Sequence, residues 1–565
     1  MDLILIVVIG VVLVCVVTAV GQRANIAGPL ILVVLGLLMA IAPFIPNLQP
    51  IDPEWILVGV LPPLLYSAAV QLPAIEFRRD FTPIAGLSVL LVVITSVVLA
   101  LVFLATVPGI SPGLAIALGA ILSPTDAVAT SIARRMGLAP RVVTMLEGES
   151  LLNDATALVL LRTAVAAIAA GFSWGDAAGS FFWGVAIAAV VGTAAGLVNL
   201  RVRAWVRHPA ANTALSFTVP FVAYLPTEAL GGSGLVAAVV AGIVTGQGAA
   251  RWFTPEQRLS DELNWRTVEL LLEGGVFLLM GLELTDVVTR NLEDHGGLWH
   301  GTWLALIALG VILAVRAGYV AVLIGWQHGR ARRAASAPGG GPSAAGPPPR
   351  APAPPEHARG AMRQRLRRLA SDLDYYRAQP LGWKHGAVIV WGGMRGVVTL
   401  AAAQTLPADT DQRALLVFVA FMVATISLLV QGFTLAPLVR MLRIPPDATA
   451  EPSRAERARL DARLRSAAAA VLRDSRAVRR DGEPFPPELV ARVGPALVEP
   501  PDDDTTALAR DILELRLALI EVMRRRLVEI SATGEFSTAS LRHALAELDA
   551  DQLGLELRIA DEPGQ

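Results

Sequence analysis

An acidic and polar stretch lies inside a segment that is otherwise typical of a membrane-spanning helix. Residues 146–154 read Leu-Glu-Gly-Glu-Ser-Leu-Leu-Asn-Asp, and an apolar run follows over residues 155–170. An ionised carboxylate near the middle of such a helix costs roughly 3 kcal/mol on insertion scales, so a chain retains one where it has a function. Ion or proton transfer is the default hypothesis, and it centres on Asp154.

Helical spacing sorts the polar side chains of this stretch onto two faces. Ser150 and Asp154 share one face, and Glu149 and Asn153 share the adjacent one. The first face can present a hydroxyl and a carboxylate to an ion, and the second an acid and an amide to a neighbouring helix. Arg316 lies among apolar residues and is the expected partner of Glu149, because buried charges pair. We expect this pair to stabilise the fold rather than to bind the ion.

A second group of candidate residues surrounds an expected break in a spanning helix. Residues 123–128 read Ser-Pro-Thr-Asp-Ala-Val. Pro124 removes one backbone hydrogen bond and disfavours helical geometry at the residue before it. The freed carbonyls and the Ser123 and Thr125 hydroxyls suit a small cation, and Asp126 lies where it compensates the N-terminal end of the second half-helix. A simple proline kink is the alternative, but it leaves the acid unexplained.

A third group predicts a second break. Residues 392–398 read Gly-Gly-Met-Arg-Gly-Val-Val, and Arg395 is suited to balancing the negative ends of half-helices. Close packing through small residues is the alternative, and it explains the glycines but not the arginine. The two broken spans run in opposite directions through the bilayer. That arrangement is typical of an inverted-repeat secondary transporter with its site near the midplane.

Composition independently indicates a membrane protein. The chain has 565 residues, of which 54% are hydrophobic and 17% charged, and its mean hydropathy is +0.57. Soluble chains of this length are less apolar. The formal net charge of −1 gives no sign of a nucleic-acid partner, and Cys15 has no second cysteine with which to form an intrachain disulfide.

The apolar runs predict an all-α polytopic protein with about thirteen spans. The runs lie near residues 3–20, 27–46, 54–72, 83–107, 111–133, 142–170, 178–200, 213–230, 232–250, 264–286, 301–326, 384–405 and 412–438. Arginines gather in alternate connections, which places the N-terminus outside and the C-terminus in the cytoplasm. The first run has no basic segment before it, so we interpret it as a retained helix rather than a cleaved signal.

Two segments fall outside the predicted membrane domain of residues 1–440. Residues 327–383 form a Pro/Gly-rich loop whose first part is predicted to be disordered. The basic part of the loop either forms a helix on the anionic leaflet or simply follows the positive-inside rule. Residues 446–565 predict a helical cytosolic domain, with amphipathic helices over residues 455–480, 506–531 and 538–554.

Taken together, these residues resemble the cation:proton antiporter-1 family of sodium/proton exchangers, in its bacterial NhaP-like form. The resemblance covers roughly residues 1–440. It rests on residues 123–128 and 147–154, Gly-Met-Arg-Gly at 393–396, Phe-Leu-Leu-Met-Gly at 277–281, and Ala-Tyr-Leu at 223–225 with Glu228.

The resemblance implies an NhaA-type inverted-repeat fold of thirteen helices with two unwound crossing helices, a homodimer, and a moving core of spans 4–6 and 11–13. It also implies that Asp154 is the shared ion and proton site. Ser150 and Thr125 would contribute oxygens to this site, with Asp126 close by. The supporting residues would be Asn153, Glu149, Arg316 and Arg395.

The sequence departs from the family pattern at one position. Family members often carry an acid at the end of a run that here reads Leu-Pro-Pro-Leu-Leu-Tyr-Ser over residues 61–67. Ser67 offers a hydroxyl in its place, so we expect one fewer negative charge in the site. Arg162, eight residues after Asp154, has no assigned role beyond facing an outer aqueous funnel.

The predicted function is exchange of a monovalent cation, Na⁺ in the first place, for H⁺ across the cell membrane, serving pH and sodium homeostasis. A carboxylate that accepts either ion couples the two fluxes if the core moves only when Asp154 is occupied. Because Asn153 is neutral, one acid titrates and electroneutral exchange is the simpler expectation. The same oxygens serve K⁺ and Li⁺, so K⁺/H⁺ antiport is an alternative. No cofactor is expected beyond the transported ions.

Two other functional classes also use polar groups inside a membrane. An ion channel would place carboxylates there, but the sequence carries no repeated selectivity-filter signature. A membrane-embedded enzyme is weaker still, because all seven histidines lie in loops, span ends or the tail.

Overall fold

The computed structural model of the chain describes residues 2–24, 26–41, 54–170, 174–206, 208–293, 298–336, 381–407 and 410–444, with scattered positions between 462 and 555. The chain divides into two compact units, residues 1–450 and residues 451–565. The first unit contains every residue of the candidate site.

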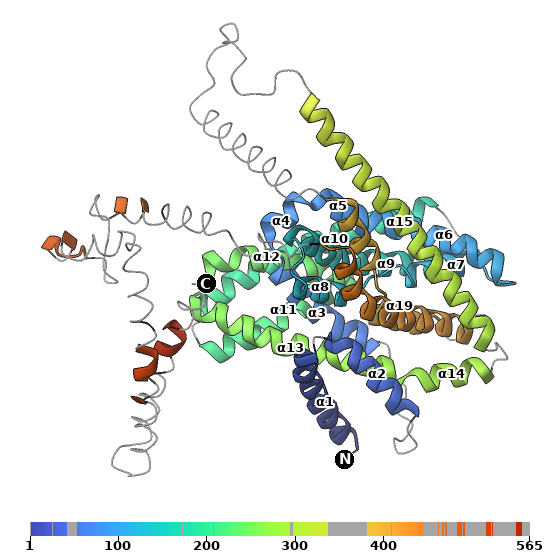
Figure 1. Ribbon diagram of the computed structural model, residues 1–565, viewed down its shortest axis with the longest axis horizontal. Coiled ribbons are helices and arrows are strands. Elements are labelled where there is room, and N and C mark those ends of the chain that lie inside the picture. The colour runs from blue at the N-terminus through green and yellow to red at the C-terminus, as the bar shows by residue number, and fades with distance from the viewer. Residues whose placement is uncertain are drawn as a thin grey trace, which may run out of the picture. The chain divides into compact units, whose positions relative to one another are not determined.

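The regular elements described in the first unit are all helical (Figure 1). In chain order they are α1 (Asp2–Ala24), α2 (Gly28–Ile41), the π-helical turn η1 (Trp55–Val60), α3 (Leu61–Gln71), α4 (Ala74–Arg79), α5 (Phe81–Ala85), the π-helical turn η2 (Gly86–Leu90), α6 (Leu91–Thr106), α7 (Pro112–Ile121), α8 (Val128–Arg135), α9 (Pro140–Ala170), α10 (Trp174–Trp205), α11 (Pro209–Ala229), α12 (Gly234–Trp252), α13 (Pro255–Leu282), α14 (Leu284–Glu293), α15 (Leu298–Ser336), α17 (Trp383–Trp391), α18 (Val397–Gln404) and α19 (Arg413–Met441).

Several of these helices have the length and composition of membrane spans. Within the described residues, five are long and apolar enough to cross a bilayer: Phe81–Thr106, Gly179–Trp205, Gly234–Trp252, Leu298–Gln327 and Arg413–Met441. Each of the predicted apolar runs overlaps a helix or a pair of consecutive helices. Large apolar side chains such as Phe182 and Val190 are exposed on α10, as expected of a surface that faces lipid.

Two helix boundaries differ from the predicted ones for identifiable reasons. α13 begins at Pro255 rather than near 264, because Thr254 and Gln257 form a capping box and proline is suited to the first helical position. α15 continues to Ser336, so residues 327–336 of the predicted loop are helical. The apolar run ends near 326, but the Ala/Arg-rich residues that follow still favour a helix. Residues 337–380 of the loop lie outside the described residues.

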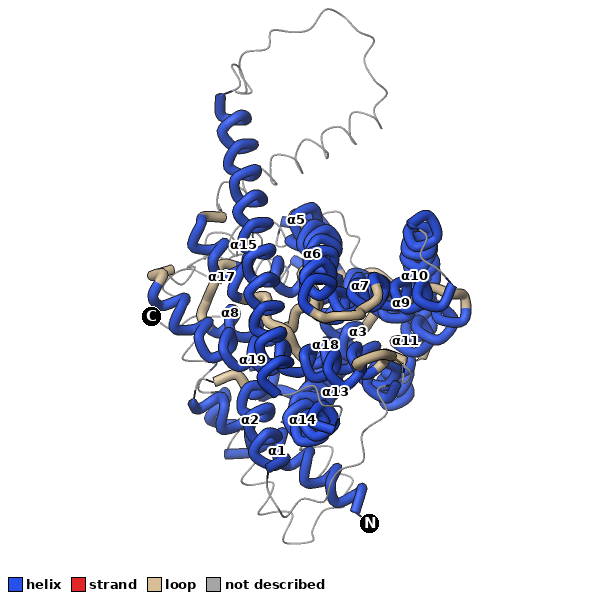
Figure 2. Tube along the Cα trace, turned by 90° about the vertical axis from the view of Figure 1, so that its right-hand side faces the viewer, coloured by secondary structure: helices blue, strands red, loops and turns tan. Residues whose placement is uncertain are grey.

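The helices form two packed groups, with the site between them (Figure 2). In one group, which we call the crossing bundle, α6 packs on α7 and α15, α7 packs on α9, and α19 packs on α15 and α18. In the other, which we call the scaffold bundle, α12 packs on α3, α10 and α11, and α13 packs on α2. α9 connects the two, because it also contacts α10 and α12.

Both predicted helix breaks are present in the crossing bundle. The first separates α7 from α8 and contains Pro124; the second separates α17 from α18. The two breaks meet, since the Asp126 backbone N–H donates a hydrogen bond of 2.7 Å to the Met394 carbonyl. The irregular backbone therefore finds its hydrogen-bond partners within the protein, which is the condition for tolerating it at membrane depth.

The second unit is described only at scattered positions. Residues 516–520 and 551–555 are helical, within two of the predicted tail helices or at their edge. Ile520, Leu548 and Leu555 form a small buried apolar cluster. Within the predicted helix 455–480, residues 469–471 are helical. Most of that predicted helix lies outside the described residues.

Candidate functional site

Arg395 joins the C-terminal ends of the two broken helices. Its Nε donates a hydrogen bond of 3.1 Å to the Leu122 carbonyl at the end of α7, and its Nη1 donates to the Gly393 carbonyl just after α17. Its backbone N–H donates to the Ser427 hydroxyl of α19 at 3.0 Å. Because helix C-termini carry partial negative charge, a buried guanidinium at this position stabilises both ends at once. This geometry agrees with the role that the sequence suggested for Arg395.

Asp126 occupies the N-terminal end of α8. Its Oδ1 accepts a hydrogen bond of 2.9 Å from the Val128 backbone N–H, which is the cap that a carboxylate makes at a positive helix end. The other break lies directly against the same carboxylate, because a Cβ at Gly396 would collide with the Asp126 side chain. The glycine is therefore required for the two breaks to cross this closely.

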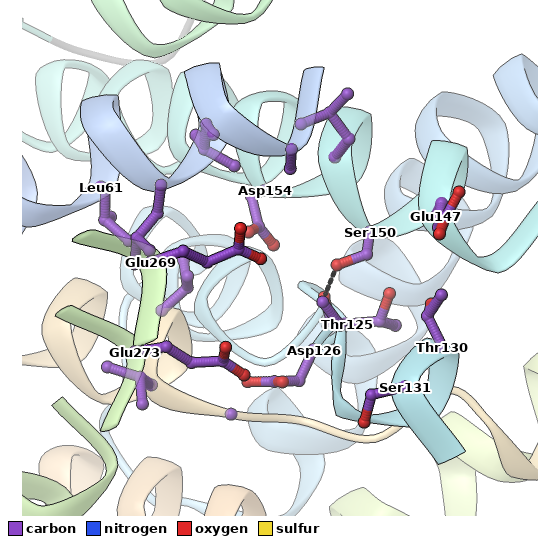
Figure 3. A pocket seen from close by; sticks show the side chains of 18 of the residues that line it. Leu61, Thr125, Asp126, Thr130, Ser131, Glu147, Ser150, Asp154, Glu269 and Glu273 are labelled. Carbon is purple, nitrogen blue, oxygen red and sulfur yellow. Dashed lines mark hydrogen bonds between the residues drawn. The ribbon is translucent and has the colours of Figure 1, made fainter. Parts of the chain in front are cut away.

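Asp154 lies on α9 beside the crossing and is buried, with 6% of its surface exposed. Its Oδ1 has no hydrogen-bond partner within the part of the chain that the structure describes. Nearby, Ser150 Oγ donates to the Thr125 carbonyl at 2.9 Å (Figure 3). Asn153 Nδ2 donates to Thr125 Oγ1 at 2.5 Å. A buried carboxylate oxygen without a partner is costly unless an ion or proton satisfies it.

Glu149 and Asn153, which share a face of α9, contact two different parts of the protein rather than one neighbouring helix. Glu149 forms a buried ion pair with Arg316 of α15, in which Nη2 donates to Oε2 at 2.8 Å and Nη1 donates to Oε1. Arg316 Nε also donates to the Ile389 carbonyl of α17 at 2.9 Å. Asn153 instead contacts Thr125, because four residues along a helix rise about 6 Å and reach a different element.

A cavity of about 240 Å³ lies between the crossing and α13. Seven of its lining side chains carry carboxylates or hydroxyls from α8, α9 and the first helix break, and two carboxylates come from α13. The lining includes Thr125, Asp126, Ser150, Asp154, Glu269 and Glu273. Arg134 of α8 and Glu147 of α9 also line it and form an ion pair, in which the arginine is largely exposed.

Sequence reasoning missed the two α13 acids of this cavity. Glu269 and Glu273 are four residues apart and so share one face of α13. Figure 3 shows both side chains extending from α13 toward the side where Asp126 and Asp154 lie. The available signal was two acids at helical spacing inside the predicted span 264–286, which is otherwise apolar from Leu270 to Leu282.

Ser67 contacts a carboxylate of α13. Its Oγ donates to Glu269 Oε2 at 3.3 Å, and Gln71 Nε2 donates to the same carboxylate oxygen at 3.2 Å. The hydroxyl at this position of α3 is therefore next to an acid that lies 202 residues further along the chain.

Arg162 has a partner that the sequence did not reveal. It forms an ion pair of 2.5 Å with Glu228 Oε2 of α11, and Glu228 Oε1 accepts a hydrogen bond of 2.8 Å from the Gly234 backbone N–H at the start of α12. Arg162 lies two helical turns beyond Asp154 on α9. The pair therefore links α9 to the scaffold bundle on the far side of Asp154 from Glu147.

Comparison with known proteins agrees with this geometry. The sequence pattern of the transmembrane sodium/hydrogen exchanger family matches residues 9–441. A Na⁺/H⁺ exchanger of Mycobacterium tuberculosis strain H37Rv is 29% identical over 95% of this chain and 93% of its own length. The Na⁺/H⁺ antiporter ApNhaP of Aphanothece halophytica is 27% identical over 74% of this chain and 70% of its own.

A third relative and a solved structure complete the comparison. An antiporter of Bacillus pumilus named for sodium, potassium, lithium, rubidium and H⁺ is 32% identical over 47% of this chain and 41% of its own. The sodium proton antiporter MjNhaP1 of Methanocaldococcus jannaschii, solved at pH 8, has a TM-score of 0.56 at 16% identity over 79% of this chain and 100% of its own. That likeness shows a shared fold. Since the family pattern covers most of the chain, this protein belongs to the transmembrane sodium/hydrogen exchanger family.

Proposed function

We propose that this protein exchanges a monovalent cation for H⁺ across the membrane, with Asp154 as the shared binding site. The observation that carries the proposal is the Asp154 carboxylate: it is buried, one oxygen lacks a partner among the described residues, and it lines a cavity. Family membership supports the reaction class, and the names of the curated relatives support cation/proton exchange.

The oxygens around Asp154 suit a small monovalent cation. Asp126 is held by the N-terminal end of α8 and lines the same cavity, so it adds a carboxylate beside Asp154. Ser150 and Thr125 add hydroxyl oxygens, and each keeps a lone pair beyond the hydrogen bonds that fix their positions. A proton on Asp154 removes the charge that binds the cation. The two ions therefore compete for one carboxylate.

Coupling follows if the two helix groups change their relative position only when Asp154 is neutralised. An empty, ionised carboxylate would have to cross the low-dielectric interior between the two access routes, which costs several kcal/mol. Either a proton or a cation removes that cost. One titrating aspartate beside the neutral Asn153 gives one proton for one cation, and hence electroneutral exchange.

We propose the finer architecture from the same pattern. The chain crosses the membrane thirteen times in an inverted repeat, with its N-terminus outside and its C-terminus in the cytoplasm. The crossing bundle is the moving part. The arginine bias then makes the mouth beside Arg134 and Glu147 the cytoplasmic one, so this arrangement is open to the cytoplasm. The protein acts as a homodimer in the bacterial inner membrane and contributes to pH and sodium homeostasis.

Na⁺ is the proposed cation, and K⁺ is the second candidate. The relatives named for sodium support the first, and the Bacillus pumilus relative, whose name includes potassium, lithium and rubidium, supports the second. The oxygen ligands on Asp154, Ser150 and Thr125 do not by themselves discriminate between these ions.

The test is proton flux in everted membrane vesicles that contain the full chain and an entrapped pH dye. Asp154→Asn keeps the side-chain volume but removes the exchangeable charge, so we expect no cation-driven flux with Na⁺, K⁺ or Li⁺ at normal protein amounts. Asp286→Asn is the matched control, because Asp286 is an exposed partner of Arg290 on α14 and should leave flux unchanged. Full flux through Asp154→Asn would overturn the site assignment.

A further inference from the structure

The face of α13 that carries Glu269 and Glu273 has no assigned role in the exchange described above. Both side chains are half-buried and line the cavity that contains Asp126 and Asp154. Among the described residues, no arginine, lysine or histidine forms an ion pair with either glutamate. Arg134, the basic residue of the lining, is engaged by Glu147. Acidic side chains therefore outnumber basic ones among the residues that line the cavity.

Glu269 is held in place by neutral donors of α3. Ser67 Oγ donates to Glu269 Oε2 at 3.3 Å, Gln71 Nε2 donates to the same oxygen at 3.2 Å, and Gln71 Nε2 also donates to Ser67 Oγ at 3.2 Å. Two donors to one oxygen fix the orientation of the Glu269 carboxylate. The other oxygen, Oε1, accepts no hydrogen bond among the described residues and is left for a ligand in the cavity.

Asp154 supplies a second and independent sign that the cavity receives a cation. It is more than nine-tenths buried, its Oδ1 lacks a partner among the described residues, and it lines the same cavity. Figure 3 shows Asp154 and Glu269 on facing sides of the space. Glu269 is the more exposed of the two, so we expect an entering cation to meet it first.

We propose that Glu269, positioned by Ser67 and Gln71, is a cation-loading site that precedes Asp154. This proposal rests on the proposed exchange function and extends it. Glu269 stands on the scaffold bundle, whereas Asp154 stands on α9 beside the crossing. The cation is bound first on one bundle and then transferred to the other. Glu273, one turn further along the same face, contributes charge to the transfer path.

A loading site of this kind changes the rate at which the protein captures the cation, and it does so on one side of the membrane only. A cleft lined by one sign of charge raises the local counter-ion concentration and the rate of capture. Removing one of its charges should therefore raise the half-saturating cation concentration by about three- to tenfold on the side to which the cavity opens. The maximal rate should change little, because Asp154 still carries the ion.

The experiment measures Na⁺-driven proton flux in purified full-length protein reconstituted in liposomes, with Na⁺ varied on one side at a time. Glu269→Gln should raise half-saturation on the cavity side and leave the opposite side unchanged. Glu262→Gln is the matched control, since Glu262 lies on the same helix but pairs with Arg266 at the exposed surface. Glu269→Asp keeps the charge and should stay near wild type.

A relocation variant tests position rather than charge alone. Because Ser67 Oγ lies 3.3 Å from Glu269 Oε2, Ser67→Glu combined with Glu269→Gln returns a carboxylate to the same place from α3. The double variant should bring half-saturation back toward wild type. Tryptophan fluorescence and thermal melting of each purified variant establish that it is folded.

The outcomes separate the two proposals. If wild-type protein shows Na⁺-driven flux and Glu269→Gln has the half-saturation of Glu262→Gln on both sides, the loading site is wrong while the exchange function stands. The loading site is also wrong if Glu269→Gln lowers the maximal rate alone, because that result indicates a structural role. If the wild type itself shows no flux under conditions where the protein is folded, the exchange function fails and the loading site fails with it.

Discussion

The residues around Asp154 divide into those that hold the backbone and those that face the cavity. Glu149 and Arg316 belong to the first class: both side chains are 2% exposed and their charges satisfy each other. Arg316 also packs against the second break, because a Cβ at Gly393 would lie 2.5 Å from its Nε. The ion pair thus stabilises the region in which the helices cross, without entering the cavity.

Removing both members of this ion pair should destabilise the protein by less than the sum of the two single losses. Glu149→Ala or Arg316→Ala leaves an uncompensated buried charge, which costs roughly 3–5 kcal/mol, whereas the double variant leaves none. We expect lower amounts of folded protein and lower melting temperatures in detergent for each single variant, with the double variant less harmed than the sum. Glu262→Ala, which breaks an exposed pair, should cost less than about 1 kcal/mol. Strictly additive losses would contradict the coupling.

Sequence alone predicts Asp154, Asp126 and Arg316 because a charge within an apolar run is conspicuous wherever it folds. It does not reveal Glu269, because the side chain that positions this glutamate, Ser67, lies 202 residues earlier in the chain. Arg162 is missed for the same reason, since its partner Glu228 lies on another helix. A single sequence shows which side chains are costly to bury but not which ones meet.

At the scale of elements, the sequence predicts that two helices are broken, but it does not predict how closely the two breaks approach each other. Pro124 predicts the first break, because proline lacks the N–H that a helix needs. The glycines of residues 392–396 predict the second. The contact between the breaks depends on the absence of one particular side chain. Gly396 has no positive φ, so its requirement is steric: the Asp126 carboxylate occupies the space of its Cβ.

Gly396→Ala should therefore disable exchange while leaving most of the helices intact. The new methyl group would displace the Asp126 carboxylate from the Val128 N–H and separate the two breaks. We expect the flux in vesicles, at equal protein amounts, to fall by at least about tenfold, because small misplacements of reacting groups have effects of that size or more.

Gly318→Ala on α15 provides the control for that substitution. A Cβ at Gly318 meets no atom within 4 Å, and alanine favours a helix, so exchange should be unchanged. Flux through Gly396→Ala that matched Gly318→Ala would show that the crossing tolerates a wider separation.

At the scale of the whole chain, the membrane unit contains all the polar groups of the site. Asp154, the crossing and α13 all fall within residues 1–450, and residues 451–565 form a separate compact unit. Within the membrane unit, the Arg162–Glu228 pair ties α9 to α11 at one end of the site, while the cavity lies at the other.

Truncation after residue 446 should leave exchange intact, because the described residues that line the cavity all lie between Leu61 and Val398. The pH at which exchange is fastest can still change, because a regulatory segment alters the populations of the protein's conformations rather than the ion-binding site itself. The measurement is flux in vesicles across a series of pH values, with the full chain in parallel. A truncated protein that is stable and dimeric but inactive at every pH would show that the tail is part of the transport machinery.

The one-sided position of Glu269 and Glu273 has a consequence for energy conversion. Groups that bind an ion on one face change how quickly that ion is captured and released there. They leave untouched the gradients at which net flux stops, because binding free energies around a closed cycle cancel. For one-for-one exchange, flux ends when the cation concentration ratio across the membrane equals the proton ratio. On the proposed loading role, the α13 glutamates set the cation concentration range over which one face of the protein responds, while the ion gradients alone set the end point.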